Sequence, residues 1–357
     1  MHGLHRQRFT VAGLALAAMA LFVAACSSSS SGSGGGSSSS GLTGTLNGSG
    51  STLQLVYQQQ AIQSFKSIQP SITVNYGGGG SGKGRTDLAS NVVQFAGSDS
   101  PISSTDLPLF KGKTVLYYPI LIGPITVSYN LPGIKTLKLD APTIADIFQA
   151  KITKWNDPKI TALNPGVKLP STAITIAHRS DSSGTTQNFS LFLDEGAPGV
   201  WKLGSSSTIS WPANSRGGDG NGGVAQIIKS TPGAIGYVDF ADAKASGLTW
   251  ASIKNKDGDY IEPTTQSATA AASHATVKPD LTFSAVWAPG AKSYPITAQS
   301  WVLVYQKQSS STTTKNLKAY IGYLVGDGQK LLAQLGYAPL PSSIDQQAKA
   351  QLSQIGS

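Results

Sequence analysis

The chain has little of the material that metal and thiol chemistry requires. Its 357 residues include one cysteine and four histidines. One cysteine cannot form an internal disulfide, and it cannot supply a cysteine-based zinc site. Only 13% of the residues are charged, and the 27 Lys+Arg are scattered without long basic runs. The net charge of +9 therefore does not indicate a nucleic-acid-binding protein.

The remaining composition is that of an ordinary folded chain. Hydrophobic residues make up 39%, and 40 glycines bring the apolar share to about 50%, which excludes global disorder. The length exceeds the size at which a single core stops growing, so two domains are expected rather than one.

The first 41 residues have the pattern of an exported, lipid-anchored protein. Arg6 and Arg8 precede an almost wholly apolar stretch over residues 9–23, which is too short for a typical membrane span. The small residues before Cys26 resemble a lipobox, which predicts a signal peptide over 1–25 and acylation of Cys26; a plain signal peptide with a free thiol is the alternative. Residues 26–41 then form a flexible Ser/Gly tether.

Removal of residues 1–25 changes the charge and histidine counts of the mature chain. It leaves 25 basic against 18 acidic residues, a net +7, and only His178 and His274. Two histidines so far apart in sequence are poor material for a metal centre or a histidine-based triad, and a structural role is expected for each. The sequence therefore predicts neither an enzyme nor a bound cofactor.

From residue 42 onward, short apolar strands alternate with helical stretches. Apolar residues at a spacing of three to four predict a helix from Leu53 to Ile68, ended by Pro70. Alternating strands and helices favour α/β layers with mainly parallel sheet. The other predicted strands are Leu42–Leu46, Ile72–Tyr76, Phe95–Gly97, Val115–Tyr118, Ile125–Tyr129, Ile174–His178, Ile235–Val238 and Val302–Tyr305. The other predicted helices start near Arg85 and cover Thr143–Phe148, Thr185–Leu193 and Asn316–Leu335, the last interrupted at 326–328, and 309–314 is expected to be a loop.

Three polar, glycine-rich turns each follow a predicted strand and precede a predicted helix. They lie at 48–52, 80–82 and 182–186. Unpaired N–H groups and a partial positive charge at helix N-termini, with added hydroxyls, suit an oxyanion. Arg179 precedes the third turn and offers a planar fork for phosphate or carboxylate. Asp181 could hold that guanidinium or could simply form an Asx turn, and any one turn could be only a helix cap.

One glycine-rich segment fits a different motif incompletely. Residues 77–83 match G-x-x-x-x-G-K, the phosphate loop of nucleotide hydrolases, but Gly84 follows where Ser or Thr would bind Mg²⁺. An exported chain is also separated from cytosolic ATP, so a nucleotide site is not expected.

Asp99 is an acidic residue among groups that suit an anion. A carboxylate beside an anion is repulsive unless the ligand carries a proton. Hydrogen phosphate can donate one and sulfate cannot, so Asp99 would select phosphate against sulfate. Taken alone, an aspartate in this position is more often a surface residue at a strand end.

Together these segments resemble the phosphate-binding lipoproteins of bacterial phosphate ABC importers over essentially all of the mature chain. Any one segment is weak evidence, but the ordered set is specific. The resemblance is carried by 48–53, Asn75-Tyr76 with 80–82, 95–99, 151–157, 163–166, 179–185, 232–238 and 294–297.

The resemblance implies a two-lobed type II periplasmic-binding-protein fold, each lobe a mainly parallel sheet flanked by helices, with a two-stranded hinge and phosphate in the cleft. Lobe one would comprise 42–126 plus 295–357, and lobe two 127–294. The protein would bind inorganic phosphate outside the cytoplasmic membrane and deliver it to the importer's permease subunits, as a monomer. The implied ligands are Thr52, the Leu53 N–H, Ser81, Asp99, Arg179, Ser183, the Gly184 N–H and Thr185, with Asp181 orienting Arg179.

Several differences and alternatives stay open. His178 stands where the family can have a second arginine, which leaves the local charge open. A binding protein for another oxyanion or an organic phosphate, and an added role as a lipid-tethered adhesin or surface antigen, are compatible with the sequence. A secreted phosphate-transferring enzyme would need a metal cluster or an activated nucleophile.

Overall fold

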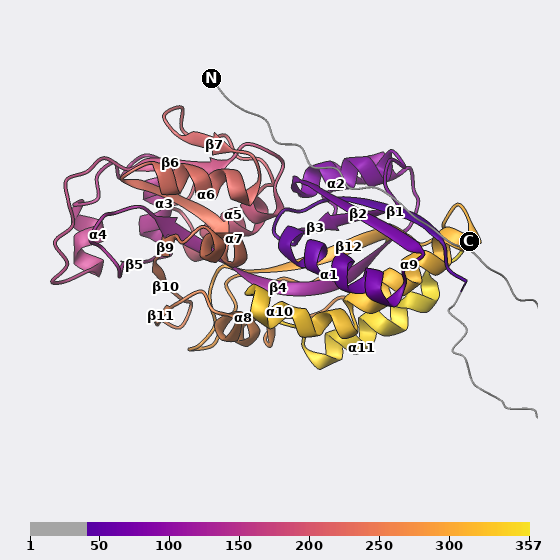
Figure 1. Ribbon diagram of the computed structural model, residues 1–357. Helices are drawn as coiled ribbons and strands as arrows, with labels where there is room; N and C mark the ends of the chain where they lie inside the picture. The colour runs from indigo at the N-terminus through magenta and orange to yellow at the C-terminus, as the bar shows by residue number, and fades with distance from the viewer. Residues whose placement is uncertain (1–40) are drawn as a thin grey trace, which may run out of the picture. The chain divides into compact units, whose positions relative to one another are not determined.

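A nine-stranded sheet with helices packed around it organises residues 41–357, the part of the chain that the computed structural model describes (Figure 1). The predicted signal peptide and Cys26 lie outside the described residues, as does all of the predicted tether except Gly41. The strands are β1 Gly44–Gly50, β2 Ile72–Gly79, β3 Phe95–Ser98, β4 Val115–Tyr129, β5 Lys138–Leu139, β6 Thr175–Arg179, β7 Arg216–Gly218, β8 Ala234–Asp239, β9 Thr249–Trp250, β10 Ser252–Lys254, β11 Tyr260–Ile261 and β12 Thr297–Tyr305.

The helices fall between these strands and after the last one. The α-helices are α1 Leu55–Ile68, α2 Gly80–Ala89, α3 Ala141–Phe148, α4 Pro158–Leu163, α5 Gly184–Gly196, α6 Gly220–Ser230, α7 Phe240–Ala245, α8 Thr265–Ala272, α9 Ser311–Leu324, α10 Leu332–Leu335 and α11 Ser342–Gln351. Three short 3₁₀ segments are η1 Leu107–Phe110, η2 Asp327–Leu331 and η3 Leu352–Gln354.

The sheet has two halves joined through one strand. Its order is β2-β1-β3-β12-β4-β8-β6-β7, with β9 also on β4. We call β2, β1, β3 and β12 the first half-sheet and β8, β6 and β7 the second half-sheet; they lie on either side of β4 (Figure 1). Pairing is parallel among β2, β1 and β3 and among β8, β6 and β7, whereas β12 and β4 run antiparallel to their neighbours. The fold is α/β as predicted, and its mixed sheet is parallel except where β12 and β4 pair with their neighbours.

β4 is one 15-residue strand where the sequence predicted two. It pairs with β12 up to Pro124 and with β8 from Ile125 onward. Proline has no N–H to donate to a ladder, so it is tolerated where pairing changes. Pro124 stands at the change of partner, and Pro119 stands beside the register shift between Ser300 and Trp301. The backbone nevertheless continues through both prolines as a single strand.

The predicted helix before Pro70 is α1, and its buried stripe matches the predicted spacing. Tyr57, Ala61 and Phe65 are almost fully buried in the largest hydrophobic cluster. That cluster runs through both half-sheets, because it also contains Ile235 of β8, together with Trp155 from the segment after α3. The Trp155 indole N–H donates to the Gly233 carbonyl at 2.9 Å, which anchors the ring within this core.

α2 begins five residues earlier than the sequence predicted. The expected glycine-rich turn over 77–84 is the end of β2 followed directly by helix. Glycine disfavours helix by about 1 kcal/mol relative to alanine, but packing requires it here. A Cβ on Gly84 would lie 2.7 Å from Gly50 Cα, and one on Gly82 would lie 2.2 Å from Ser182 Oγ. Close backbone approach therefore outweighs helix propensity. The expected loop over 309–314 is likewise mostly helical, because the Ser310 side chain caps α9.

The segment from α8 to β12 packs with the first half-sheet. Ala268, Phe283 and Ala285 share a hydrophobic cluster with Ile122 and Trp301. The Trp301 indole also donates to the Leu281 carbonyl at 3.0 Å. The lobe boundaries remain a prediction, and this packing favours counting the α8 segment with lobe one instead of lobe two.

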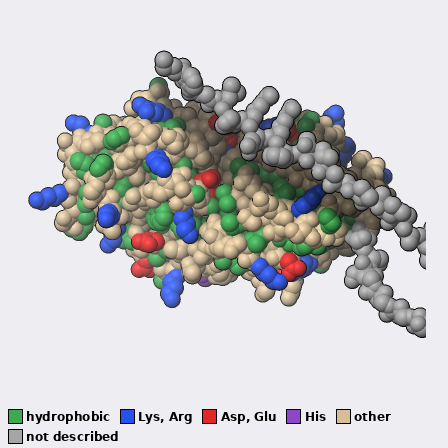
Figure 2. Space-filling model, in the orientation of Figure 1, with side chains coloured by type: hydrophobic (Ala, Val, Ile, Leu, Met, Phe, Trp, Pro, Cys, Tyr) green, Lys and Arg blue, Asp and Glu red, His purple; other side chains and the backbone are tan. Residues whose placement is uncertain are grey.

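Charged side chains are dispersed over the surface. Figure 2 shows lysine and arginine side chains scattered over one face of the described residues, without a single basic patch. This agrees with the scatter of basic residues along the sequence.

Candidate functional site

The predicted site residues meet where strands from both half-sheets end. Thr52 follows β1, Asp99 follows β3 and Arg179 ends β6, while Ser81 and Gly184 start α2 and α5. In α/β sheets, ligands bind beyond the carboxyl ends of parallel strands. Contacts cross between the halves: the Gly184 N–H donates to Ser81 Oγ at 3.2 Å, and the Gly82 N–H donates to the Ser182 carbonyl at 2.9 Å. Ser51 of the first turn and Ser81 of the second both donate to the Asp99 carboxylate, so the three glycine-rich turns lie together.

Asp99 is buried, with 1% of its surface exposed. Its carboxylate accepts hydrogen bonds from Ser300 Oγ at 2.5 Å, from Ser51 Oγ at 2.6 Å and more weakly from Ser81 Oγ at 3.3 Å. Burial raises the pKa of Asp99, and these hydrogen bonds and the Arg179 charge only partly oppose that shift. The structure thus excludes a surface strand-end position for Asp99.

Arg179 is held in one orientation by Asp181. Its Nε donates to Asp181 Oδ1 at 2.7 Å, Nη2 donates to Asp181 Oδ2, and Nη1 donates to Thr185 Oγ1 at 3.3 Å. Burial acts to raise the pKa of Asp181, but the Arg179 hydrogen bonds and charge outweigh it and lower that pKa. Asp181 therefore stays ionised and fixes the guanidinium, the role that the family resemblance implied.

Four predicted hydroxyls accept hydrogen bonds from N–H donors of the protein. Ser81 Oγ accepts from the Asp99 and Gly184 backbones, and Ser183 Oγ accepts from the Thr186 N–H at 3.1 Å as the cap of α5. Thr185 Oγ1 accepts from Arg179, and Thr52 Oγ1 accepts from Asn221. A hydroxyl that accepts in this way keeps its own proton for another acceptor. The O–H groups of Thr52, Ser183 and Thr185 can thus donate to an anion bound between the half-sheets, whereas the Ser81 O–H donates to Asp99 in this structure.

The two predicted backbone donors have protein partners in this structure. The Leu53 N–H donates to Ser51 Oγ at 3.1 Å, and the Gly184 N–H donates to Ser81 Oγ. Both partners are serine hydroxyls that also contact Asp99. A ligand that takes these N–H bonds must therefore compete with the network around Asp99.

Two glycines permit the close approach of the half-sheets. A Cβ on Gly184 would lie 2.5 Å from Ser81 Oγ and 2.6 Å from Asp99 Cβ. Gly80 has φ of +86°, and a Cβ there would lie 2.1 Å from Asp181 Oδ2. Only glycine fits these positions when the site is closed.

Sequence reasoning missed the amide and serine groups that surround Asp99 and Thr52. Asn188 Nδ2 donates to the Asp99 carbonyl at 2.7 Å, and Gln299 Nε2 donates to Asn188 Oδ1 at 3.0 Å. Asn221, on the other side of the site, donates to Thr52. Ser51 lies inside the predicted turn at 48–52, but Asn188, Gln299 and Asn221 lie in segments without a local motif. Their roles depend on which distant segments pack together.

His178 has a structural role. Its ring stacks on Trp211 with centroids 5.2 Å apart, and Nδ1 lies 2.8 Å from the Arg179 carbonyl, to which it donates. Burial lowers the pKa of His178, so the ring is neutral at neutral pH. The histidine therefore adds no positive charge beside Arg179.

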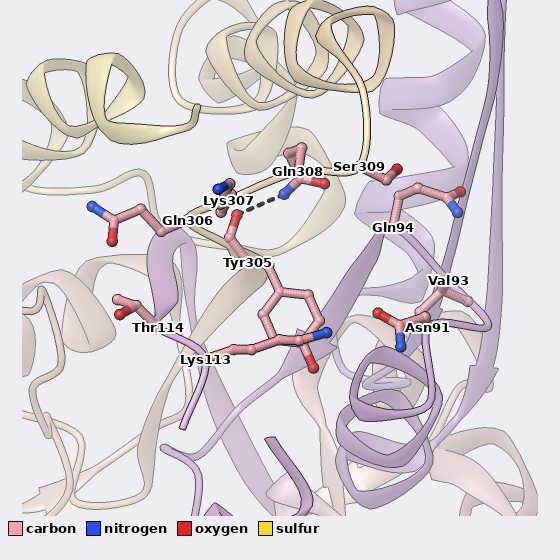
Figure 3. Close-up of a pocket in the computed structure, with 10 residues that line it drawn as sticks. All are labelled: Asn91, Val93, Gln94, Lys113, Thr114, Tyr305, Gln306, Lys307, Gln308 and Ser309. Atoms are coloured by element: carbon pink, nitrogen blue, oxygen red, sulfur yellow. Dashed lines mark hydrogen bonds between the residues drawn. The ribbon is translucent and has the colours of Figure 1, made fainter. Parts of the chain in front are cut away.

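The described residues hold no candidate metal centre, and one cavity lies away from this site. No group of three or more His, Cys, Asp or Glu side chains there is placed to hold a metal ion. A cavity of about 630 Å³ lies at the other end of the strands, lined by residues such as Gln94, Lys113 and Tyr305 (Figure 3). Gln94 precedes β3 and Asp99 follows it, so this cavity is separate from the site around Asp99.

Comparison with curated proteins shows close similarity to one family. The model of the PBP superfamily domain matches residues 35–328. The chain is 38% identical over 284 residues to the phosphate-binding protein PstS of Haemophilus influenzae, covering 78% of this chain and 84% of the relative. It is 36% identical over 322 residues to phosphate-binding protein PstS 2 of Mycobacterium tuberculosis, covering 87% of each chain.

Solved structures share the fold at lower sequence identity. A phosphate binding protein from Stenotrophomonas maltophilia has a TM-score of 0.70 at 19% identity, covering 87% of this chain and 94% of the other. A phosphate ABC transporter substrate-binding protein from Clostridium perfringens, described as putative and with bound phosphate, has a TM-score of 0.62 at 17% identity, covering 84% and 100%. The fold, the family model and the curated relatives agree, and the chain belongs to the PstS phosphate-binding protein family of the PBP superfamily.

Proposed function

We propose that the protein binds inorganic phosphate between its two half-sheets and presents it to an ABC-type phosphate importer. The observation that carries this proposal is the buried carboxylate of Asp99 beside a buried, fixed Arg179. Most of the surrounding groups are hydroxyls and backbone N–H donors, which suit an oxyanion. A single acceptor among many donors suits an oxyanion that still carries a proton.

The proposed ligands are the hydroxyls of Thr52, Ser81, Ser183 and Thr185, the Leu53 and Gly184 N–H groups, Arg179 and Asp99. Binding would replace the serine partners of the two N–H groups with phosphate oxygens. Because these groups come from both half-sheets, the anion makes its full set of contacts only in the closed form. A ligand that contacts the closed form best also stabilises it.

Asp99 is proposed to select phosphate over sulfate. An ionised Asp99 can accept a hydrogen bond from the P–OH group of hydrogen phosphate. Sulfate at neutral pH offers no proton and would place its oxygens against a buried carboxylate, which typically costs several kcal/mol when a buried charge faces no donor. The acceptor therefore works mainly by rejecting the wrong anion.

Lipid anchoring at Cys26 is proposed from the sequence. The lipobox-like segment and the Ser/Gly tether would hold the binding domain, as a monomer, at the outer face of the cell membrane. No helix in the described part of the chain is long and apolar enough to cross a membrane. The Cys26→Ala variant should leave the membrane fraction, and retention there would contradict the anchor.

Calorimetric titration with phosphate and with sulfate tests the binding proposal. Wild type should bind phosphate much more tightly than sulfate. Asp99→Asn, which replaces the acceptor by an amide that can donate, should gain sulfate affinity and lose the selectivity. Asp194→Asn makes the same change at an exposed site on α5 and serves as the control. Tight sulfate binding by wild type would overturn the proposal, and unchanged selectivity in Asp99→Asn would remove Asp99 from this role.

A further inference from the structure

Asn221 contacts residues from both sides of the proposed site, although no sequence motif indicated it. It is the second residue of α6, a helix that packs on the second half-sheet, and it is fully buried. Its backbone N–H and its side-chain Nδ2 both donate to Thr52 Oγ1 across the cleft, each at 3.2 Å. Nδ2 also donates to Thr185 Oγ1 at 3.3 Å. One carboxamide nitrogen thus joins two of the proposed phosphate-binding hydroxyls, one from each half-sheet.

The direction of these hydrogen bonds sets the direction of the hydroxyl protons. A threonine hydroxyl has two acceptor positions and one proton. Thr52 Oγ1 accepts both bonds from Asn221, and Thr185 Oγ1 accepts one bond from Asn221 and one from Arg179. Among the described residues, neither hydroxyl donates to a protein acceptor. Both protons are therefore left for an acceptor that the protein does not provide.

The remaining polar atom of Asn221, its side-chain oxygen, gains no hydrogen bond within residues 41–357 from this placement. Asn221 Oδ1 is buried and has no hydrogen-bond partner in the described part of the molecule. An unsatisfied buried acceptor is unfavourable, and such conflicts gather at functional sites. A small apolar side chain would avoid this cost, but it would lose both donated hydrogen bonds.

We propose that Asn221 is a positioning residue of the phosphate site, which links Thr52 to Thr185 across the cleft and turns both hydroxyl protons toward the bound anion. This proposal rests on the proposed phosphate binding. The proposal gives α6 a part both in closing the half-sheets and in recognising phosphate, although no predicted ligand lies on this helix. Asn221 acts through the two threonines and needs no contact with phosphate.

A double-mutant cycle with inorganic phosphate tests this role. Asn221→Ala in the purified protein should bind phosphate about tenfold more weakly, the loss expected when hydroxyl donors are no longer oriented. In a Thr52→Val background, where one of the two oriented hydroxyls is absent, the same substitution should cost clearly less. Gln226→Ala removes a carboxamide from an exposed position on the same helix and should leave affinity unchanged.

A second variant and a folding measurement separate positioning from a structural role. Asn221→Asp keeps the side-chain shape but offers only acceptors, which draw the threonine protons away from the anion, and should bind phosphate more weakly than Asn221→Ala. Thermal melting without phosphate reports whether each variant is folded. Wild-type affinity in Asn221→Ala or Asn221→Asp, or fully additive losses in the cycle, would overturn the inference. Absence of phosphate binding by wild type would instead refute the proposed function, and the inference with it.

Discussion

Gly184→Ala should prevent the two half-sheets from closing, and so weaken phosphate binding, without impairing folding. The added Cβ would lie 2.6 Å from Asp99 Cβ and 2.5 Å from Ser81 Oγ. Ser81 could change rotamer, but Asp99 Cβ is fixed by the backbone after β3. Carbon atoms pack at about 3.5–4.0 Å, so the half-sheets must separate by about 1 Å. The Gly184 N–H to Ser81 Oγ bond, now 3.2 Å, would then exceed the range of a hydrogen bond.

The cost to phosphate binding follows from the contacts that closure supplies. An opened site would lose at least two hydrogen bonds to a charged ligand, each worth about 1.5–3 kcal/mol. Together these correspond to a phosphate affinity lower by a factor of about 100 or more. Folding should be spared, since Gly184 starts α5 without a positive φ and alanine favours helix over glycine.

Calorimetry with phosphate and thermal melting without it measure the two effects separately. Gly222→Ala is the matched control, because it lies on α6 with open space where its Cβ would be. It should bind as wild type and melt slightly higher. A Gly184→Ala variant that binds phosphate as tightly as wild type would refute the steric argument. A variant that fails to fold would refute the claim that only closure needs this glycine.

Three further outcomes are expected from the charges of the molecule. Burial raises the pKa of Asp99, so its carboxyl takes up a proton at a higher pH than an exposed Asp. The selectivity for phosphate over sulfate should therefore shrink as pH falls through that pKa. Competition titrations with Asp99→Asn should show no such pH dependence. Arg179→Lys keeps the charge but loses the planar fork held by Asp181, and calorimetry should show phosphate affinity lower by roughly 10-fold to 100-fold. Burial, together with the nearby Asp242 charge, raises the pKa of Asp239, whose Oδ2 has no partner among the described residues. Its protonated form fits the fold better, so the contribution of Asp239 to the free energy of unfolding is fully present below its unfolded-state pKa and is lost as pH rises through its folded-state pKa. Chemical denaturation of Asp239→Asn should lack this fall, and a wild type that is equally stable across the acidic range would contradict it.

Much of the proposed site could be predicted because its parts are encoded locally. A strand end, a polar glycine-rich turn and a helix start are adjacent in sequence, so Thr52, Ser81, Asp99 and Arg179 could each be recognised within a few residues. Strand and helix types followed from periodicity in the same way. Local patterns predicted the wrong structure where packing outweighed propensity. At the start of α2 the glycines have low helix propensity, but they allow close contact between backbones.

The partners of these residues could not be predicted, because they depend on pairing between distant segments. Ser300 reaches Asp99 from 201 residues away, because β12 pairs with β3 so that Trp301 lies opposite Ser98. Asn221 reaches Thr52 from 169 residues away. The sequence by itself determined which groups could bind an oxyanion, since short turns set their own geometry. Only the tertiary structure decided which hydroxyls and amides surround them, because a hydrogen bond between segments forms only after the sheet has brought them together.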